Sequence, residues 1–146
     1  VLLRTSASFV LRRTSFFGSP PLIAGIGVDI VEIGRIRALF ERYGERFVRR
    51  VFGPEEIRHC AGRIDPSASL AARFAAKEAF VKALGTGMTR GIRFQDIQVT
   101  GEQPPRIRLS GRAHTLAEGM GVSGVHVSLS HERTHAVAMV IVEVMP

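Results

Sequence analysis

Apolar residues along the chain change their spacing near residue 30, and the change separates a predicted strand from a predicted helix. The run over 22–30 is almost wholly apolar and includes Gly25 and Gly27, which is typical of a strand whose backbone lies close to another element. From Val31 apolar residues recur every three or four positions as far as Phe40. This second spacing predicts a helix.

Further helices are predicted in the middle of the chain. Two short ones are expected around 47–51 and from Pro54, where a proline and two acidic residues suit a first helical turn. The longest predicted helix begins at Ser67 or Ser69, after an Asp-Pro turn, and continues to Leu84. A glycine-rich loop follows it and ends it.

The second half of the chain alternates between strand and helix patterns. We expect two strands near 92–100 and 106–109, a helix from Ser110 or Gly111 to Glu118, and a closing hairpin of strands 125–130 and 136–144 with its turn at 131–134. These elements follow one another without a regular strand–helix–strand rhythm. The sequence therefore predicts the α+β class, with an antiparallel sheet packed against a long helix and shorter helices.

Composition indicates one globular domain that follows a distinct first segment. The chain has 146 residues, of which 45% are hydrophobic and 23% charged, enough for a core. Residues 1–22 hold three arginines, four serines and no acidic residue. They suit a flexible basic appendage to a domain at 23–146, in origin an organellar presequence, a secretory n-region or an extended gene start. Arg12 and Arg13 interrupt the apolar stretch that a secretory signal needs.

Charge and cysteine content narrow the expected partners and compartment. The net charge is +7, which favours anionic partners such as phosphorylated molecules, nucleic acid or an acidic protein surface, although many proteins are basic without such a partner. No run approaches the roughly 18 apolar residues that cross a bilayer, so no membrane span is expected. Cys60 is the only cysteine; no internal disulfide can form, and a cytoplasmic location is predicted.

Asp29 and Glu78, on two predicted elements, are candidate ligands for a metal ion, and each also has an ordinary interpretation. Asp29 ends the first strand and suits either a helix cap with Glu32 or an oxygen ligand for Mg²⁺. Glu78 and Lys82 can form an exposed pair one helical turn apart. Alanines on nearly every side of that helix, however, let other backbone approach. We therefore expect Lys77 and Glu78 to lie against packed protein and to need a metal ion or a phosphate as partner.

Two further motifs are compatible with phosphate binding. Gly85, Thr86 and Gly87 follow the long helix and form either a loop whose amides approach an anion or an ordinary helix end. His131, at the tip of the closing hairpin, can meet a phosphate or be simply solvated.

Arginines cluster within 16 residues of the first helices. They form either a solvated face or a docking face for an acidic helix or nucleic acid. The arginines of this cluster are Arg35, Arg37, Arg42, Arg46, Arg49 and Arg50.

Two segments together resemble a known family. GIGVDIVEIGRI at 25–36 and RFAAKEAFVKALGTG at 73–87 are similar to the holo-acyl-carrier-protein synthase branch of the 4′-phosphopantetheinyl transferases. The resemblance continues through GIRFQDIQV at 91–99 and HVSLSHERTHAVAMVIVE at 126–143. It implies an α+β homotrimer with active sites between subunits. Residues 1–22 have no counterpart in the family, and the loop at 101–105 is a compact version of its hairpin.

The resemblance also implies an activity and roles for individual residues. The activity is Mg²⁺-dependent transfer of phosphopantetheine from coenzyme A to a serine of acyl carrier protein, in fatty acid biosynthesis. Asp29 and Glu78 would be the metal ligands, and Lys82 would lie near the diphosphate of coenzyme A. For the general base of this reaction we expect Glu78, acting directly or through a metal-bound water. The expected coenzyme A-binding residues are Arg73, Lys77, Gly85, Thr86 and His131, and Arg35 lies on the helix expected to receive the carrier protein.

Two other functions stay open at this point. A basic nucleic-acid-binding protein would explain the charge, but the chain lacks strands with interleaved aromatic residues or a known reading motif. A catalytically silent trimeric subunit would keep the fold alone. The presence of Asp29, Glu78 and Lys82 together favours the enzyme.

Overall fold

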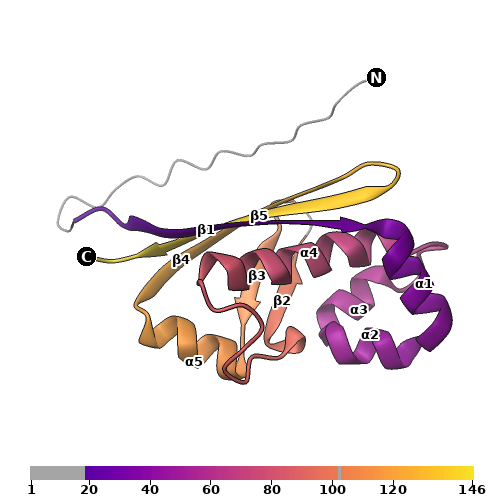
Figure 1. Cartoon of the computed structure of the whole chain (residues 1–146), viewed down its shortest axis with the longest axis horizontal. Helices are drawn as coiled ribbons and strands as arrows, with labels where there is room; N and C mark the ends of the chain where they lie inside the picture. The colour runs from indigo at the N-terminus through magenta and orange to yellow at the C-terminus, as the bar shows by residue number, and fades with distance from the viewer. Residues whose placement is uncertain (1–18, 102) are drawn as a thin grey trace.

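A three-stranded antiparallel sheet extends across the molecule, and one long helix lies along one of its faces (Figure 1). The computed structural model describes residues 19–101 and 103–146. The strands are β1 (Leu22–Glu32), β5 (His135–Val144) and β4 (Val122–His131), in the order β1-β5-β4. The helix is α4 (Ser67–Ala83). The first and last strands of the described chain, β1 and β5, thus pair with each other. The predicted antiparallel sheet and the predicted long helix are both confirmed.

Glycines in β1 allow α4 to lie directly on this strand. A Cβ atom added to Gly25 would come within 1.9 Å of the carbonyl oxygen of Ala83, and one added to Gly27 within 1.9 Å of that of Ala79. No side chain fits such a gap, so both positions require glycine. The predicted close approach of the first strand to another element is confirmed.

The core lies between the sheet and α4. Alternate residues of β5 face the helix and are buried, namely Ala136, Ala138, Val140 and Val142. Alanines of α4 pack against the sheet, and Phe80 and Val81 of the same helix are fully buried. Small side chains at the contact let the helix lie close, and the larger ones fill the space beside it.

The remaining elements surround α4 on the side away from the sheet (Figure 1). Three helices cluster at one end: α1 (Ile33–Tyr43), α2 (Glu45–Val51) and α3 (Pro54–Cys60). A separate two-stranded ribbon of β2 (Ile97–Thr100) and β3 (Arg106–Leu109) follows the short η1 helix (Phe94–Asp96), and then comes α5 (Gly111–Gly119).

Several element boundaries differ from the prediction. The strand expected from residue 92 begins at Ile97, because buried Asp96 accepts a hydrogen bond from the amide of Arg93 and closes a 3₁₀ turn before it. The helix expected from Val31 begins at Ile33, because β1 stays paired with β5 as far as Glu32. Strand β4 begins at residue 122, three residues earlier than expected.

Most of the predicted N-terminal appendage, residues 1–22, lies outside the described residues, which begin at residue 19. Within 19–101 and 103–146, none of the helices is long and apolar enough to span a membrane.

Candidate functional site

Asp29 lies inside β1, on the face of the sheet that α4 covers. It pairs with Ala138 of β5, three residues before the strand ends, so it does not cap the following helix. Its side chain is only 15% exposed. The structure contradicts the helix-cap interpretation of Asp29, and the interpretation of Asp29 as a metal ligand stays a prediction.

The partner of Asp29 comes from the last turn of α4. The ammonium nitrogen of Lys82 lies 2.6 Å from Asp29 Oδ1 and donates a second hydrogen bond, at 3.2 Å, to the carbonyl oxygen of Val28. Half of the Lys82 side chain is exposed. Among the described residues, the ion pair of Lys82 is therefore with Asp29 and not with Glu78, its expected neighbour on the helix.

Glu78 lies one turn before Lys82 and completes a cluster of three charges. Partial burial raises the pKa of the Glu78 carboxyl, the negative charge of Asp29 raises it further, and Lys82 opposes both effects. The two carboxylates thus act on each other across the gap between β1 and α4. We call Asp29, Glu78 and Lys82 the charge cluster.

The two carboxylates have the chemistry of a magnesium site. Mg²⁺ prefers hard oxygen ligands, and commonly takes one or two carboxylates and fills its other positions with water and substrate phosphate oxygens. In the part of the chain that the structure describes, no group of three or more His, Cys, Asp or Glu side chains could hold a metal ion. Asp29 and Glu78 would therefore supply two ligands and leave the other positions open.

Lys77 does not suit the predicted contact with coenzyme A. Its side chain is fully buried. Its ammonium group donates to Glu56 Oε2 at 2.8 Å and to the carbonyl oxygens of Phe94, at 3.0 Å, and Ile97. These bonds use all three ammonium hydrogens. Burial lowers the pKa of Lys77, and the charge of Glu56 opposes that shift. Lys77 instead ties α4 to α3 and to the start of β2.

Arg73 is also buried, and lies on another side of α4. One of its guanidinium nitrogens donates to Ser69 Oγ at 2.7 Å. Five residues separate Arg73 from Glu78, which is a rotation of about 140° around an α-helix. A single chain therefore does not bring Arg73 to the charge cluster.

The glycine-rich loop after α4 forms a helix end. The amides of Gly85, Thr86 and Gly87 donate to carbonyl oxygens of Lys82 and Val81 at 3.0–3.2 Å. Both glycines have positive φ angles, 71° and 61°, which suits the end of a helix. The helix-end interpretation is thus the one that the structure supports, because these amides already have acceptors.

His131 and Arg35 lie away from the charge cluster within one chain. His131 ends β4 and is exposed, on the edge of the sheet opposite β1. Two strand spacings, about 10 Å, separate these edges. Arg35 is exposed in the first turn of α1.

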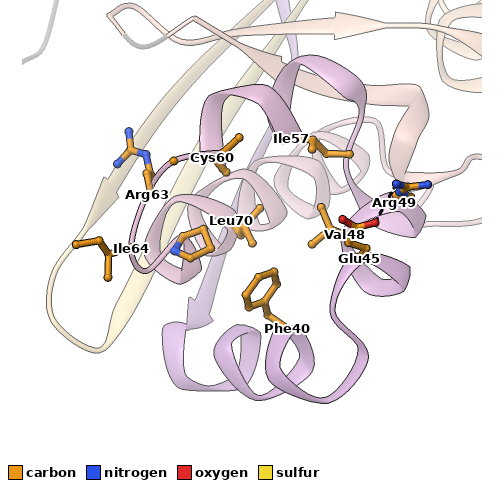
Figure 2. Close-up of a pocket in the computed structure, with 12 residues that line it drawn as sticks. Phe40, Glu45, Val48, Arg49, Ile57, Cys60, Arg63, Ile64 and Leu70 are labelled. Carbon is orange, nitrogen blue, oxygen red and sulfur yellow. Dashed lines mark hydrogen bonds and ion pairs between the residues drawn. The ribbon is translucent and has the colours of Figure 1, made fainter.

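One hollow with a mainly apolar wall lies among the helices α1, α2 and α3 and the start of α4 (Figure 2). Its volume is about 350 Å³, and its wall includes Phe40, Ile57 and Leu70. An ion pair of 2.9 Å between Arg49 and Glu45 lies at its side. No residue of the charge cluster lines it.

A second hollow lies between α2 and the segment that leads into η1. It measures about 530 Å³ and is lined by Arg50, Met88, Ile92, Arg93, Phe94 and Gln95. The ring of Phe94 stacks on that of Phe74 at 5.2 Å, and Phe74 lies one turn before Glu78. This hollow was not predictable from the sequence, because Arg50 and Arg93 are far apart along the chain and only the fold brings them together.

Comparison with known proteins gives consistent matches. A sequence model of the 4′-phosphopantetheinyl transferase superfamily matches residues 25–140. The holo-[acyl-carrier-protein] synthase of Trichlorobacter lovleyi is 47% identical over 124 residues, which are 84% of this chain and 98% of that protein. The crystal structure of the Neisseria meningitidis synthase is similar with a TM-score of 0.76 at 36% identity, covering 83% of this chain and 98% of that one.

A solved structure with a ligand is similar as well. The Helicobacter pylori synthase in complex with coenzyme A has a TM-score of 0.71 at 34% identity, covering 80% of this chain and 98% of that one.

Proposed function

We propose, because the chain belongs to the 4′-phosphopantetheinyl transferase superfamily, that it transfers phosphopantetheine from coenzyme A to a serine of apo acyl carrier protein. The second product, released along with the modified carrier protein, would be adenosine 3′,5′-bisphosphate. The observation that carries this proposal is the charge cluster, which lies within the matched residues and joins two distant parts of the sequence. The relatives named as holo-[acyl-carrier-protein] synthases support the choice of substrates, and the Helicobacter pylori complex supports coenzyme A.

Asp29 and Glu78 would hold Mg²⁺. Two carboxylates that face each other while partly buried repel each other, and a divalent cation removes that repulsion. When bound, the ion would polarise the diphosphate of coenzyme A and stabilise the charge that develops on it.

The residues of the chain can account for the rest of the transfer. The serine oxygen would attack the β-phosphorus of coenzyme A, and the bond from that phosphorus to the bridging oxygen would break. Lys82 lies close enough to Asp29 to place a positive charge beside the leaving phosphate. Glu78, whose pKa is raised, is the carboxylate best suited to accept the serine proton. Catalysis would rest mainly on positioning and charge neutralisation.

The exposed arginines of α1 and α2 would receive the carrier protein. Arg35, Arg42, Arg46 and Arg50 are exposed on these helices, and the net charge of +7 adds a field that favours an acidic partner. Acyl carrier proteins of fatty acid biosynthesis are the proposed partners, and a cytoplasmic location is proposed with them. The free, buried Cys60 is compatible with a reducing compartment.

We propose a homotrimer that covers the outer face of the sheet. Ile26, Val28 and Ile30 of β1 are 59%, 51% and 66% exposed, and Met139 of β5 is 43% exposed. These side chains form one apolar surface, since Val28 pairs with Met139, and the described helices lie on the other side of the sheet (Figure 1). Such a surface favours association. A neighbouring subunit could then bring its exposed His131 to the charge cluster.

Intact-mass spectrometry tests the activity. The chain is incubated with Mg²⁺, coenzyme A and an apo acyl carrier protein, and the carrier should gain the mass of one phosphopantetheine. A carrier whose conserved serine is replaced by alanine is the control and should gain none. Unchanged mass of the intact carrier would instead favour a silent subunit, and salt-sensitive binding to random DNA would favour the nucleic-acid alternative.

A further inference from the structure

Lys82 holds one oxygen of the carboxylate that is proposed to bind the metal. Its ammonium nitrogen lies 2.6 Å from Asp29 Oδ1, the distance of a strong charge-assisted hydrogen bond. A second bond to the carbonyl oxygen of Val28 keeps the ammonium at this end of β1. In this arrangement Lys82 is the cation that neutralises Asp29.

The ammonium group and a divalent ion would compete for Asp29. The charge cluster has two negative charges and one positive charge, so the ammonium already offsets part of the repulsion between the carboxylates. A second cation on Asp29 would lie within a few ångströms of the ammonium, and the two positive charges would repel each other. Binding of the ion is therefore easier when Lys82 has moved away.

Lys82 is able to move without disturbing the core. Half of its side chain is exposed, and it is carried by the last turn of α4. The flexible four-carbon stem lets the ammonium reach other positions near that turn. The side chain of Lys77, on the same helix, is by contrast fully buried. Of the two lysines, only Lys82 has the freedom to change partners.

We infer that Lys82 is a displaceable cation, which neutralises Asp29 in the free protein and transfers to the diphosphate of coenzyme A when that substrate binds. The inference rests on the proposed function for the identity of the substrate. It makes Mg²⁺ and coenzyme A bind cooperatively, because the anionic substrate removes the competitor of the metal ion. Such coupling is reciprocal and can be measured from either ligand.

Isothermal titration with Mg²⁺ tests this exchange without turnover, since no carrier protein is present. Wild type and Lys82→Met are titrated with and without saturating coenzyme A. Without coenzyme A, Lys82→Met should bind Mg²⁺ about tenfold more tightly than wild type, within the usual range of coupling between sites. With coenzyme A, this advantage should disappear or reverse, because Lys82 has then left Asp29 in the wild type.

Two controls accompany the titration. Arg106→Met removes one positive charge from an exposed position on β3 and should leave the Mg²⁺ affinity within about twofold of wild type, as expected for a solvent-screened charge outside the charge cluster. Lys82→Gln should behave as Lys82→Met does, and gives an uncharged polar alternative if the methionine variant does not fold.

Three results would overturn the inference. The first is an unchanged or weaker Mg²⁺ affinity of Lys82→Met in the absence of coenzyme A. The second is an equal gain with and without coenzyme A, which would mean that Lys82 is a fixed local charge. The third is a wild-type chain that binds no Mg²⁺ in either condition. Failure of the transfer reaction itself appears separately, as binding of both ligands without any mass gain of the carrier.

Discussion

Glu78 costs the folded chain stability when no metal ion is bound. Burial and the charge of Asp29 both raise its pKa, which means that the folded protein disfavours the charged carboxylate. Residues that bind a ligand often lower the stability of the ligand-free protein in this way, and binding of the ligand restores that stability. Asp29 has a partner in Lys82, whereas the charge of Glu78 is only partly offset.

Glu78→Gln should therefore raise the melting temperature of the metal-free protein at neutral pH, because it removes the charge and keeps the shape. Addition of Mg²⁺ and coenzyme A should raise the melting temperature of wild type and leave that of the variant almost unchanged. Differential scanning calorimetry with and without both ligands checks this. A variant that is less stable than wild type without ligands would contradict it.

Asp65 should make the stability depend on acid pH. Hydrogen bonding by Ser67, foremost, and the Arg37 guanidinium lower the pKa of Asp65 from 3.8 to about 2. A lowered carboxyl pKa gives stability that is present above the unfolded value and is lost as the pH falls toward the folded value. The difference in melting temperature between wild type and Asp65→Asn should thus shrink between pH 3.8 and about 2. A difference that stays constant across that range would refute the assignment.

The sequence identified Asp29 and Glu78 as candidate site residues, but it left two interpretations of each open, an ordinary structural role and a metal ligand. The capping interpretation of Asp29 failed because β1 continues to Glu32, and that continuation depends on pairing with β5 at the other end of the chain. Spacing within a short window carries no information about such a partner. Only the family motif, which spans both segments, indicated that the two carboxylates belong together.

Helix α4 shows the same limit at the scale of one element. Its start at Ser67 or Ser69 and its end at Leu84 were predicted from the turn before it and the glycines after it, and the helix begins at Ser67 and ends at Ala83. Which sides of the helix face the protein interior was harder to predict, because alanines occur on nearly all sides. Lys77 was consequently expected to bind coenzyme A, although it faces Glu56 of α3 in the interior.

The two lysines of α4 should respond differently to the same substitution. Lys77→Met would leave Glu56 buried without its partner, which typically costs about 3–5 kcal/mol. Lys82→Met breaks a half-exposed pair and should change the unfolding free energy by less than about 1 kcal/mol. Urea denaturation of both variants checks the difference. Equal losses would mean that the buried pair is not what holds α3 and β2 to α4.

Among the described residues, helices cover one face of the sheet and leave the other face open, and the proposed assembly uses this second face. The class, the antiparallel sheet and the closing hairpin were predictable from the periodic pattern. The separation of β2 and β3 into their own ribbon was not, nor was the hollow beside Arg50 and Arg93. Both depend on how elements that are distant in the sequence meet.

Met139→Glu should break the proposed trimer. The side chain lies in the middle strand of the exposed apolar face, and a charge buried there between subunits would have no partner. Size-exclusion chromatography with light scattering should show trimers for wild type and monomers for the variant. Arg106→Glu changes an exposed position on β3 and should leave the wild-type mass unchanged. A trimeric Met139→Glu protein would place the interface elsewhere.

The central claim is that the charge cluster is the catalytic centre, and one comparison tests it most directly. Initial rates of phosphopantetheine transfer are measured by intact-mass spectrometry for wild type, Asp29→Asn and Glu78→Gln at saturating Mg²⁺ and coenzyme A. Each variant should lose at least about a hundredfold in rate, the lower range for removal of an acid–base group, while its circular dichroism spectrum stays that of wild type. Folded variants that transfer at nearly the wild-type rate would contradict the claim.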